Sequence, residues 1–153
     1  MRLVSKFLRY WLPILIWLIM IFVGSTDLMS TEHTSRIIGP ILRWLHPGIS
    51  PTRIEQVQLI ARKTAHVSEY AVLSLLIFRA WANTVWPSRL AGAALITLLV
   101  SGAFAATDEF HQSFVPSRTA SARDVMIDIT GAILGLLIYW TLSRTRRNRQ
   151  SRI

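Results

Sequence analysis

The sequence predicts an all-α membrane protein: a four-transmembrane-helix bundle with a periplasmic loop that carries a short interfacial helix. Three observations favour this fold. Apolar residues make up 52% of the chain, the mean hydropathy is +0.40, and the apolar residues gather in long runs flanked by basic residues. A soluble core does not need so much apolar sequence. We interpret residues 1–153 as a single integral membrane domain.

The first span is expected over about residues 8–24. Its apolar run from Tyr10 to Gly24 follows three basic residues, and with its flanks it approaches the ~20 residues that cross the hydrocarbon of a bilayer. A cleaved signal peptide begins in a similar way. However, Pro13 and two nearby Trp residues favour a membrane anchor.

The second span is expected over about residues 61–82. The apolar stretch Ala71–Ala82 is too short to cross alone, so the helix has to reach back to about Ala61. This extension brings Lys63, His66 and Glu69 into the membrane. Counted at 100° per residue, these three side chains and Tyr70 share one broad face of the helix.

The third and fourth spans are expected over about residues 90–107 and 125–142. The third is rich in small residues, which let helices approach closely. In the fourth, Gly131 and Gly135 form one GxxxG step on a face that they share with Asp124 and Asp128. This face is expected to point into the bundle, and such faces also leave a homodimer open.

The segment between the first two spans, residues 25–56, is predicted to be a loop because it holds Pro40, Pro47 and Pro51. Within it, apolar residues between Ile37 and Leu45 fall on one helical face. This short helix either lies flat in the membrane interface or caps the bundle.

Basic residues predict the orientation. Three precede the first span, one lies in the turn 83–89, and five follow the last span in the tail 143–153. The other two connections carry five, spread over many more residues. The positive-inside rule therefore places both termini in the cytoplasm of a multi-pass protein of the bacterial inner membrane.

Charge and composition also exclude some functions. The net charge is +9, yet no basic helix with interleaved aromatic residues stands in a polar context, so nucleic-acid binding is not expected. The lipid bilayer is the expected partner. Because the chain has no cysteine, disulfides, thiolate metal sites and Cys nucleophiles are excluded.

With this topology, the polar residues of the second, third and fourth helices meet at the extracytoplasmic side. Burying ionisable groups in a membrane costs a few kcal/mol each, so they are usually paired and face the bundle interior. Packing alone could be achieved with Ser or Asn at lower cost, which favours a functional pocket. The alternative is that these groups only neutralise one another and fix helix register.

Two segments of this polar region carry a family resemblance. Arg62–Tyr70 (RKTAHVSEY) and Asp108–Arg118 (DEFHQSFVPSR), followed by Asp124, resemble the VanZ-like family, named for a teicoplanin-resistance protein. The acidic-Glu-x-x-Gln-x-x-x-Pro-x-Arg block is the specific part. The similarity runs from about Trp11 to Leu142.

One departure is Ser117, where members of this family often carry Gly, and it should alter only the turn. The resemblance implies a bacterial integral membrane protein of the cell envelope, in some members linked to lower susceptibility to glycopeptide antibiotics. It implies no known reaction.

The favoured function is a polar pocket in the extracytoplasmic leaflet that binds an anionic envelope lipid or precursor. The alternatives are a membrane-embedded hydrolase or transferase acting on a lipid-linked envelope substrate, and a small transporter or flippase. In the enzyme hypothesis the candidate catalytic residues are His66, Glu69 and Asp108. The candidate substrate-binding residues are Lys63, Tyr70, Glu109, His111, Gln112, Arg118, Asp124 and Asp128.

No metal ligands are assigned and no cofactor is expected, because compact ligand spacing such as His-Glu-x-x-His is absent from the sequence. A divalent metal such as Zn or Mn stays open within the enzyme hypothesis, since the polar region contains imidazole and carboxylate groups.

Overall fold

The computed structural model describes residues 2–26, 31–85, 89–116 and 120–150. These residues form α-helices and their connections, with no strand among them. The helices are α1 (Arg2–Ser25), α2 (Thr31–Leu45), α3 (Pro51–Thr84), α4 (Leu90–Gln112) and α5 (Ala122–Gln150). The prediction of an all-α fold is therefore confirmed.

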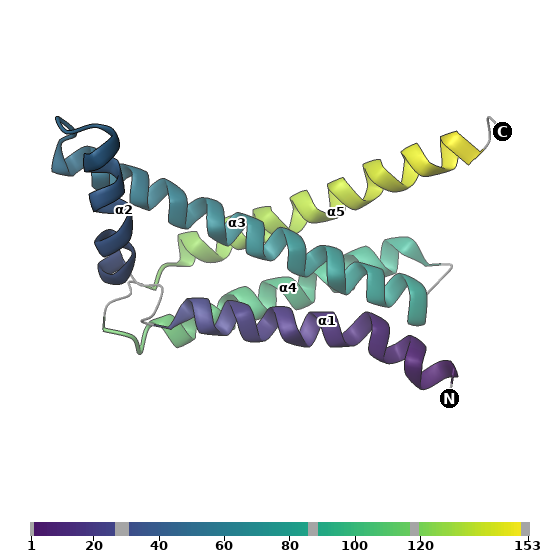
Figure 1. Ribbon diagram of the computed structural model, residues 1–153. Coiled ribbons are helices and arrows are strands. Elements are labelled where there is room, and N and C mark those ends of the chain that lie inside the picture. Colours follow the sequence, from purple (N-terminus) through teal and green to yellow (C-terminus); the bar gives the residue numbers. More distant parts are fainter. Residues whose placement is uncertain (1, 27–30, 86–88, 117–119, 151–153) are drawn as a thin grey trace.

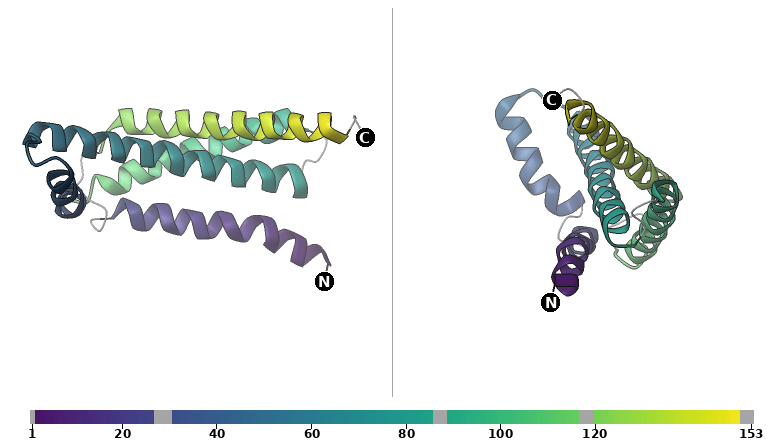
Figure 2. Two further views of the ribbon diagram at one scale, coloured as in Figure 1. Left: turned by 45° about the horizontal axis from the view of Figure 1, so that its top comes forward. Right: turned by 90° about the vertical axis from the view of Figure 1, so that its right-hand side faces the viewer.

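The four long helices α1, α3, α4 and α5 form a bundle, and α2 crosses one end of it (Figure 1). Along the chain, α1, α3, α4 and α5 run alternately toward and away from the α2 end. Both chain ends consequently lie at the opposite end of the bundle, as a second view also shows (Figure 2). The last turns of α1 and α4 and the first turns of α3 and α5 lie at the α2 end.

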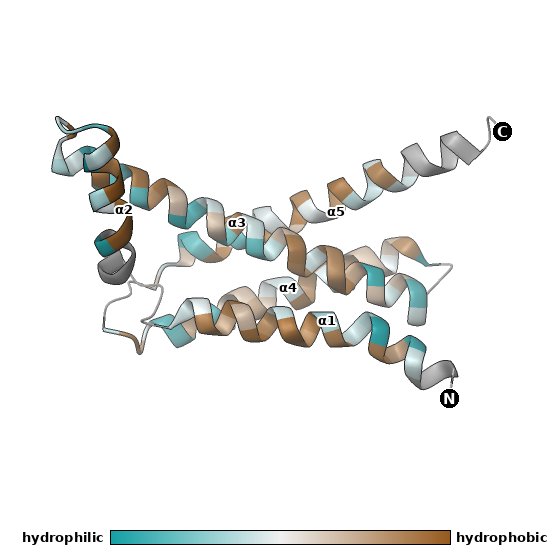
Figure 3. Ribbon diagram, in the orientation of Figure 1, coloured by the Kyte–Doolittle hydropathy of each residue, from teal (hydrophilic) through white to brown (hydrophobic). Residues whose placement is uncertain are grey.

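Three helices are long and apolar enough to cross a membrane: Ser5–Ser25, Leu90–Gln112 and Ala122–Ser143. These ranges contain the first, third and fourth spans that the sequence predicts, and the protein is a multi-pass membrane protein. In α3, by contrast, hydrophilic residues alternate with hydrophobic ones, especially in its first half (Figure 3).

The segment 25–56 is more helical than the sequence predicts. Helix α2 has 15 residues, and α3 begins at Pro51 and not near Ala61. The Oγ atom of Ser50 accepts a hydrogen bond from the backbone N–H of Arg53 (3.4 Å), which caps the helix. Proline is well tolerated at the first helical position because its missing N–H needs no partner there. Pro51 therefore starts a helix.

Helix α3 packs most extensively against α5. Two glycines of α5 allow the two helix backbones to come into contact. A Cβ atom added to Gly131 would overlap the carbonyl oxygen of Val67, and one added to Gly135 would overlap that of Ala71. The two backbones thus touch along this face, as GxxxG packing requires. Both glycines thus serve the contact between α3 and α5, and the homodimer stays a prediction.

Candidate functional site

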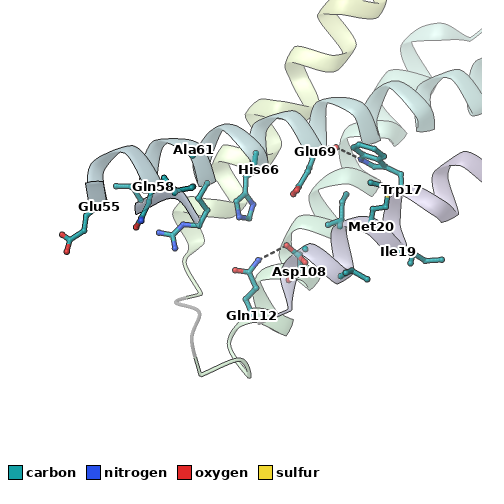
Figure 4. A pocket seen from close by; sticks show the side chains of 18 residues that line it. Trp17, Ile19, Met20, Glu55, Gln58, Ala61, His66, Glu69, Asp108 and Gln112 are labelled. Atoms are coloured by element: carbon teal, nitrogen blue, oxygen red, sulfur yellow. Dashed lines mark hydrogen bonds between the residues drawn. The ribbon is translucent and has the colours of Figure 1, made fainter. Parts of the chain in front are cut away.

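A cavity of about 760 Å³ lies at the α2 end of the bundle, between α1, α3 and α4 (Figure 4). One wall is apolar and comes from the last turns of α1, including Ile19, Met20 and Val23. The opposite wall is polar and comes from α3 and the end of α4. Its ionisable or amide side chains are Glu55, Gln58, Arg62, His66, Glu69, Asp108 and Gln112.

Hydrogen bonds from two Trp side chains attach α1 to α3, one beside the cavity and one at the far end of α3. Trp17 Nε1 donates to the carbonyl oxygen of Glu69 (2.9 Å), as Figure 4 shows. Farther along, Trp11 Nε1 donates to Thr84 Oγ1 (3.2 Å). Indole N–H groups need a partner when they are buried, so these bonds fix which face of α1 meets α3.

His66 is the point at which the cavity meets the interior of the bundle. Its ring lines the cavity, and its Nδ1 atom lies 3.1 Å from Oδ1 of Asp128 on α5. Both residues are buried, with Asp128 fully so. The close approach at Gly131, one turn farther along α5, brings this pair together.

A second pair joins the same two helices nearer their beginnings. Lys63 Nζ donates to Oδ1 of Asp124 in an ion pair. Asp124 also lies in the first turn of α5, where the N-terminal dipole favours a negative charge. The ammonium group of Lys63 and the dipole of α5 therefore both stabilise this carboxylate.

Two acidic residues near the end of α4 accept hydrogen bonds from nearby groups. Gln112 Nε2 donates to Asp108 Oδ2 (3.0 Å), and the backbone N–H of Ser121 donates to Glu109 Oε2 (2.7 Å). The second bond fixes the entry into α5. His111 lies against the ring of Phe22 on α1, with ring centroids 4.7 Å apart.

Several buried polar atoms in this region have no hydrogen-bond partner among the residues that the structure describes. They are Ser25 Oγ, Gln58 Nε2, Tyr70 OH, Glu109 Oε1, His111 Nδ1 and Asp128 Oδ2. An unsatisfied buried polar group costs about 1–3 kcal/mol. In proteins such atoms are usually satisfied by bound water, an ion or a ligand. His66, Glu109 and Asp128 also stand close enough together to hold a metal ion.

One known protein family matches the part of the chain that contains this site. The VanZ/LLP1 family model matches residues 10–143, most of the chain and all of the polar region. The chain belongs to the VanZ/LLP1 family. No curated protein and no solved structure shows significant similarity to it.

In this VanZ/LLP1 protein the residues predicted to form the site separate into three groups. His66, Glu69, Asp108 and Gln112 line the cavity. Four others lie near the cavity without lining it: Tyr70, Glu109 and Asp128, which are buried, and His111, which is half-buried. Lys63 and Asp124 bind each other between α3 and α5. Arg118 lies outside the described residues.

The sequence analysis of this family member missed part of the cavity wall. Gln58 and Arg62 line the cavity two turns and one turn, respectively, before His66. The spacing of four residues from Gln58 to Arg62 and from Arg62 to His66 was a usable signal, but the helix was expected to begin too late to include Gln58. Apart from Ser25, the α1 wall consists of apolar residues, Gly24 and Trp17, and no motif marked it.

Proposed function

We propose that α3 is a fourth membrane span and that the chain crosses the bacterial inner membrane with both termini in the cytoplasm. Its 34 residues correspond to about 51 Å at 1.5 Å per residue, more than the ~30 Å of hydrocarbon. The position of both chain ends at one end of the bundle supports an even number of crossings. The excess of basic residues at those ends supports a cytoplasmic location.

This topology puts α2 and the cavity on the periplasmic side. In α2 the apolar side chains Ile37, Ile41 and Trp44 are exposed, Trp44 to 81%. An amphipathic helix with such a face is stable when it lies along the membrane interface. The amphipathic helix therefore supports a cavity at the level of the periplasmic headgroups.

We further propose that the cavity binds an anionic envelope lipid or lipid-linked precursor. The observation that carries this proposal is the division of the cavity into one apolar and one polar wall. An amphiphile fits both walls, because its chain covers the α1 side while its headgroup replaces water at the α3 side. Through such a ligand, as the family resemblance implies, the protein would affect glycopeptide susceptibility.

The side chains of the polar wall favour particular headgroup chemistry. Arg62 supplies a permanent positive charge that suits a phosphate, and His66 lies one turn farther along. Glu69 and Asp108 supply carboxylates, which accept hydrogen bonds from hydroxyl groups. A headgroup with both a phosphate and hydroxyl groups satisfies both sets. Phosphatidylglycerol is a simple lipid of this kind, and phosphatidylcholine is not.

Native mass spectrometry of the full chain tests this proposal. We expect one phosphatidylglycerol molecule to be retained at concentrations at which phosphatidylcholine is lost. Ala65→Leu narrows the cavity from α3 and should weaken retention, whereas Ala103→Leu changes another exposed alanine, on α4 outside the cavity, and should not. Equal retention by both variants, or no preference between the two lipids, contradicts the proposal.

A second pair of variants separates the headgroup from the chain. Arg62→Gln removes the positive charge from the polar wall, and Arg53→Gln removes one from an exposed position of the same helix. We expect only Arg62→Gln to reduce the preference for phosphatidylglycerol. Loss of preference in both variants would indicate general attraction to the anionic surface.

The His66–Asp128 pair supports a second candidate function, an enzyme acting on the same lipid. A histidine whose ring is oriented by a carboxylate and faces a cavity has the arrangement of a general base. Asp128→Asn should then lower turnover of a lipid-linked substrate while lipid retention survives. Unchanged turnover in this variant would exclude the role.

A further inference from the structure

Three different helices each contribute one buried metal-ligand type to a single point. His66 comes from α3, Glu109 from α4 and Asp128 from α5, and one ligand atom from each lies within 4.8 Å of the other two. The three residues are 7%, 5% and 0% exposed. Such a cluster cannot be explained as a solvated acidic surface.

The hydrogen bonds around the cluster leave one oxygen of each carboxylate unused. Glu109 Oε2 accepts from the backbone of Ser121, and Asp128 Oδ1 lies against the ring of His66. The remaining oxygens, Glu109 Oε1 and Asp128 Oδ2, are fully buried and have no partner among the described residues. Lys63 is already bound to Asp124.

We propose that His66, Glu109 and Asp128 bind one divalent transition-metal ion such as Zn²⁺ or Mn²⁺. A divalent cation balances the two carboxylates and uses both unpartnered oxygens. One imidazole with two carboxylates suits these ions, whereas Mg²⁺ and Ca²⁺ prefer oxygen ligands alone. Two ligands of a tetrahedral ion with bonds of ~2.1 Å stand about 3.4 Å apart. Ligand atoms within 4.8 Å of one another therefore have to close in by at most about 1.4 Å on binding.

A metal ion bound to His66 would lie next to the cavity. His66 lines the cavity and the two carboxylates do not, so the ion lies at the inner edge of the polar wall. There it adds positive charge to a wall whose fixed cation is Arg62, which favours an anionic headgroup. The metal site itself does not depend on the identity of the lipid, and its test uses the metal alone.

The test measures binding of Zn²⁺ and Mn²⁺ to the full chain in detergent after removal of metal with a chelator and of any affinity tag. We expect one equivalent of either ion to bind saturably, to raise Tm, and to be removed by EDTA, with no such effect from Mg²⁺. Glu109→Gln and Asp128→Asn preserve side-chain shape and should each weaken affinity by at least the 10–100-fold that loss of an outer-shell partner costs.

Glu55→Gln is the matched control for metal binding alone: Glu55 is an exposed carboxylate of α3 that lines the cavity but stands outside the cluster. It should bind metal as the parent chain does. The stability of the metal-free variants provides a second measurement. Each substitution removes a buried negative charge but keeps one oxygen for the bond to Ser121 or His66, so Tm should stay close to that of the metal-free parent chain. Absence of saturable binding, or equal affinity in the parent chain and both cluster variants, would overturn the proposal.

Discussion

Lys63 of α3 and Asp124 of α5 form an ion pair with side chains that are 31% and 11% exposed. The pair joins the two helices that pack most extensively against each other. It lies on the same side of the α3–α5 contact as His66 and Asp128, one turn nearer the beginning of each helix. The partly buried position means that neither charge is fully stabilised by solvent when its partner is removed.

Removing one member of this pair should be worse than removing both. Lys63→Met and Asp124→Asn are each expected to destabilise the fold by roughly 1–3 kcal/mol, because each leaves a partly buried charge alone. The double variant should recover part of that loss. A double-mutant cycle on unfolding in detergent measures the coupling. Strictly additive effects would show that the pair contributes no coupling.

The α3–α5 contact predicts an unusual effect of alanine. Gly→Ala within a helix normally gains up to ~1 kcal/mol. At Gly131, however, the added Cβ overlaps the carbonyl of Val67, so we expect a net loss of about 1–3 kcal/mol from overpacking. Gly102→Ala on α4 is the control, because there the Cβ meets only Ile129 at an ordinary 3.9 Å.

Comparing Tm of these two variants with the parent chain checks the prediction. Gly131→Ala should lower Tm, and Gly102→Ala should leave it unchanged or raise it. If both variants were equally stable, α3 and α5 would not touch along this face.

Single cysteines test the proposed topology, since the chain has none of its own. Ser113 lies just after α4 at the α2 end, and Ser143 lies on α5 at the end of its apolar segment; both are exposed. An impermeant thiol reagent added to the periplasmic side should label Ser113→Cys. Ser143→Cys should be labelled only after the inner membrane is opened. The reverse pattern would place both termini in the periplasm.

The three apolar helices could be predicted from the sequence because each is a continuous apolar run of sufficient length. Helix α3 was harder to predict. Its charged residues lower the hydropathy of a long helix, and Pro51 suggested a loop although proline is common at the first position of a helix. The predicted cytoplasmic ends and interfacial helix stay predictions.

Part of the site could also be predicted, because it follows a regular sequence pattern. Helical periodicity placed Asp124 and Asp128 on the glycine face of α5, and the structure pairs them with Lys63 and His66. Periodicity does not say which helix a face meets. The sequence therefore gave no means to tell that Lys63 is bound between helices and that α1 closes the cavity.

The attachment of α1 yields a fourth prediction. Trp17→Phe removes the hydrogen bond to Glu69 and should cost about 0.5–1.5 kcal/mol, seen as a lower Tm in detergent. Trp44→Phe is the control because Trp44 is 81% exposed on α2 and should have little effect. Equal losses at the two positions would argue against the α1–α3 bond as a source of stability.

The same indole gives the protein a built-in optical probe. Trp17 is both a wall of the cavity and a ring whose orientation is fixed by its N–H bond. Exchange of water for an acyl chain beside it shifts its fluorescence to shorter wavelength. Subtracting the spectrum of Trp17→Phe isolates that signal from the other Trp residues, so occupancy can be followed in real time without a dye.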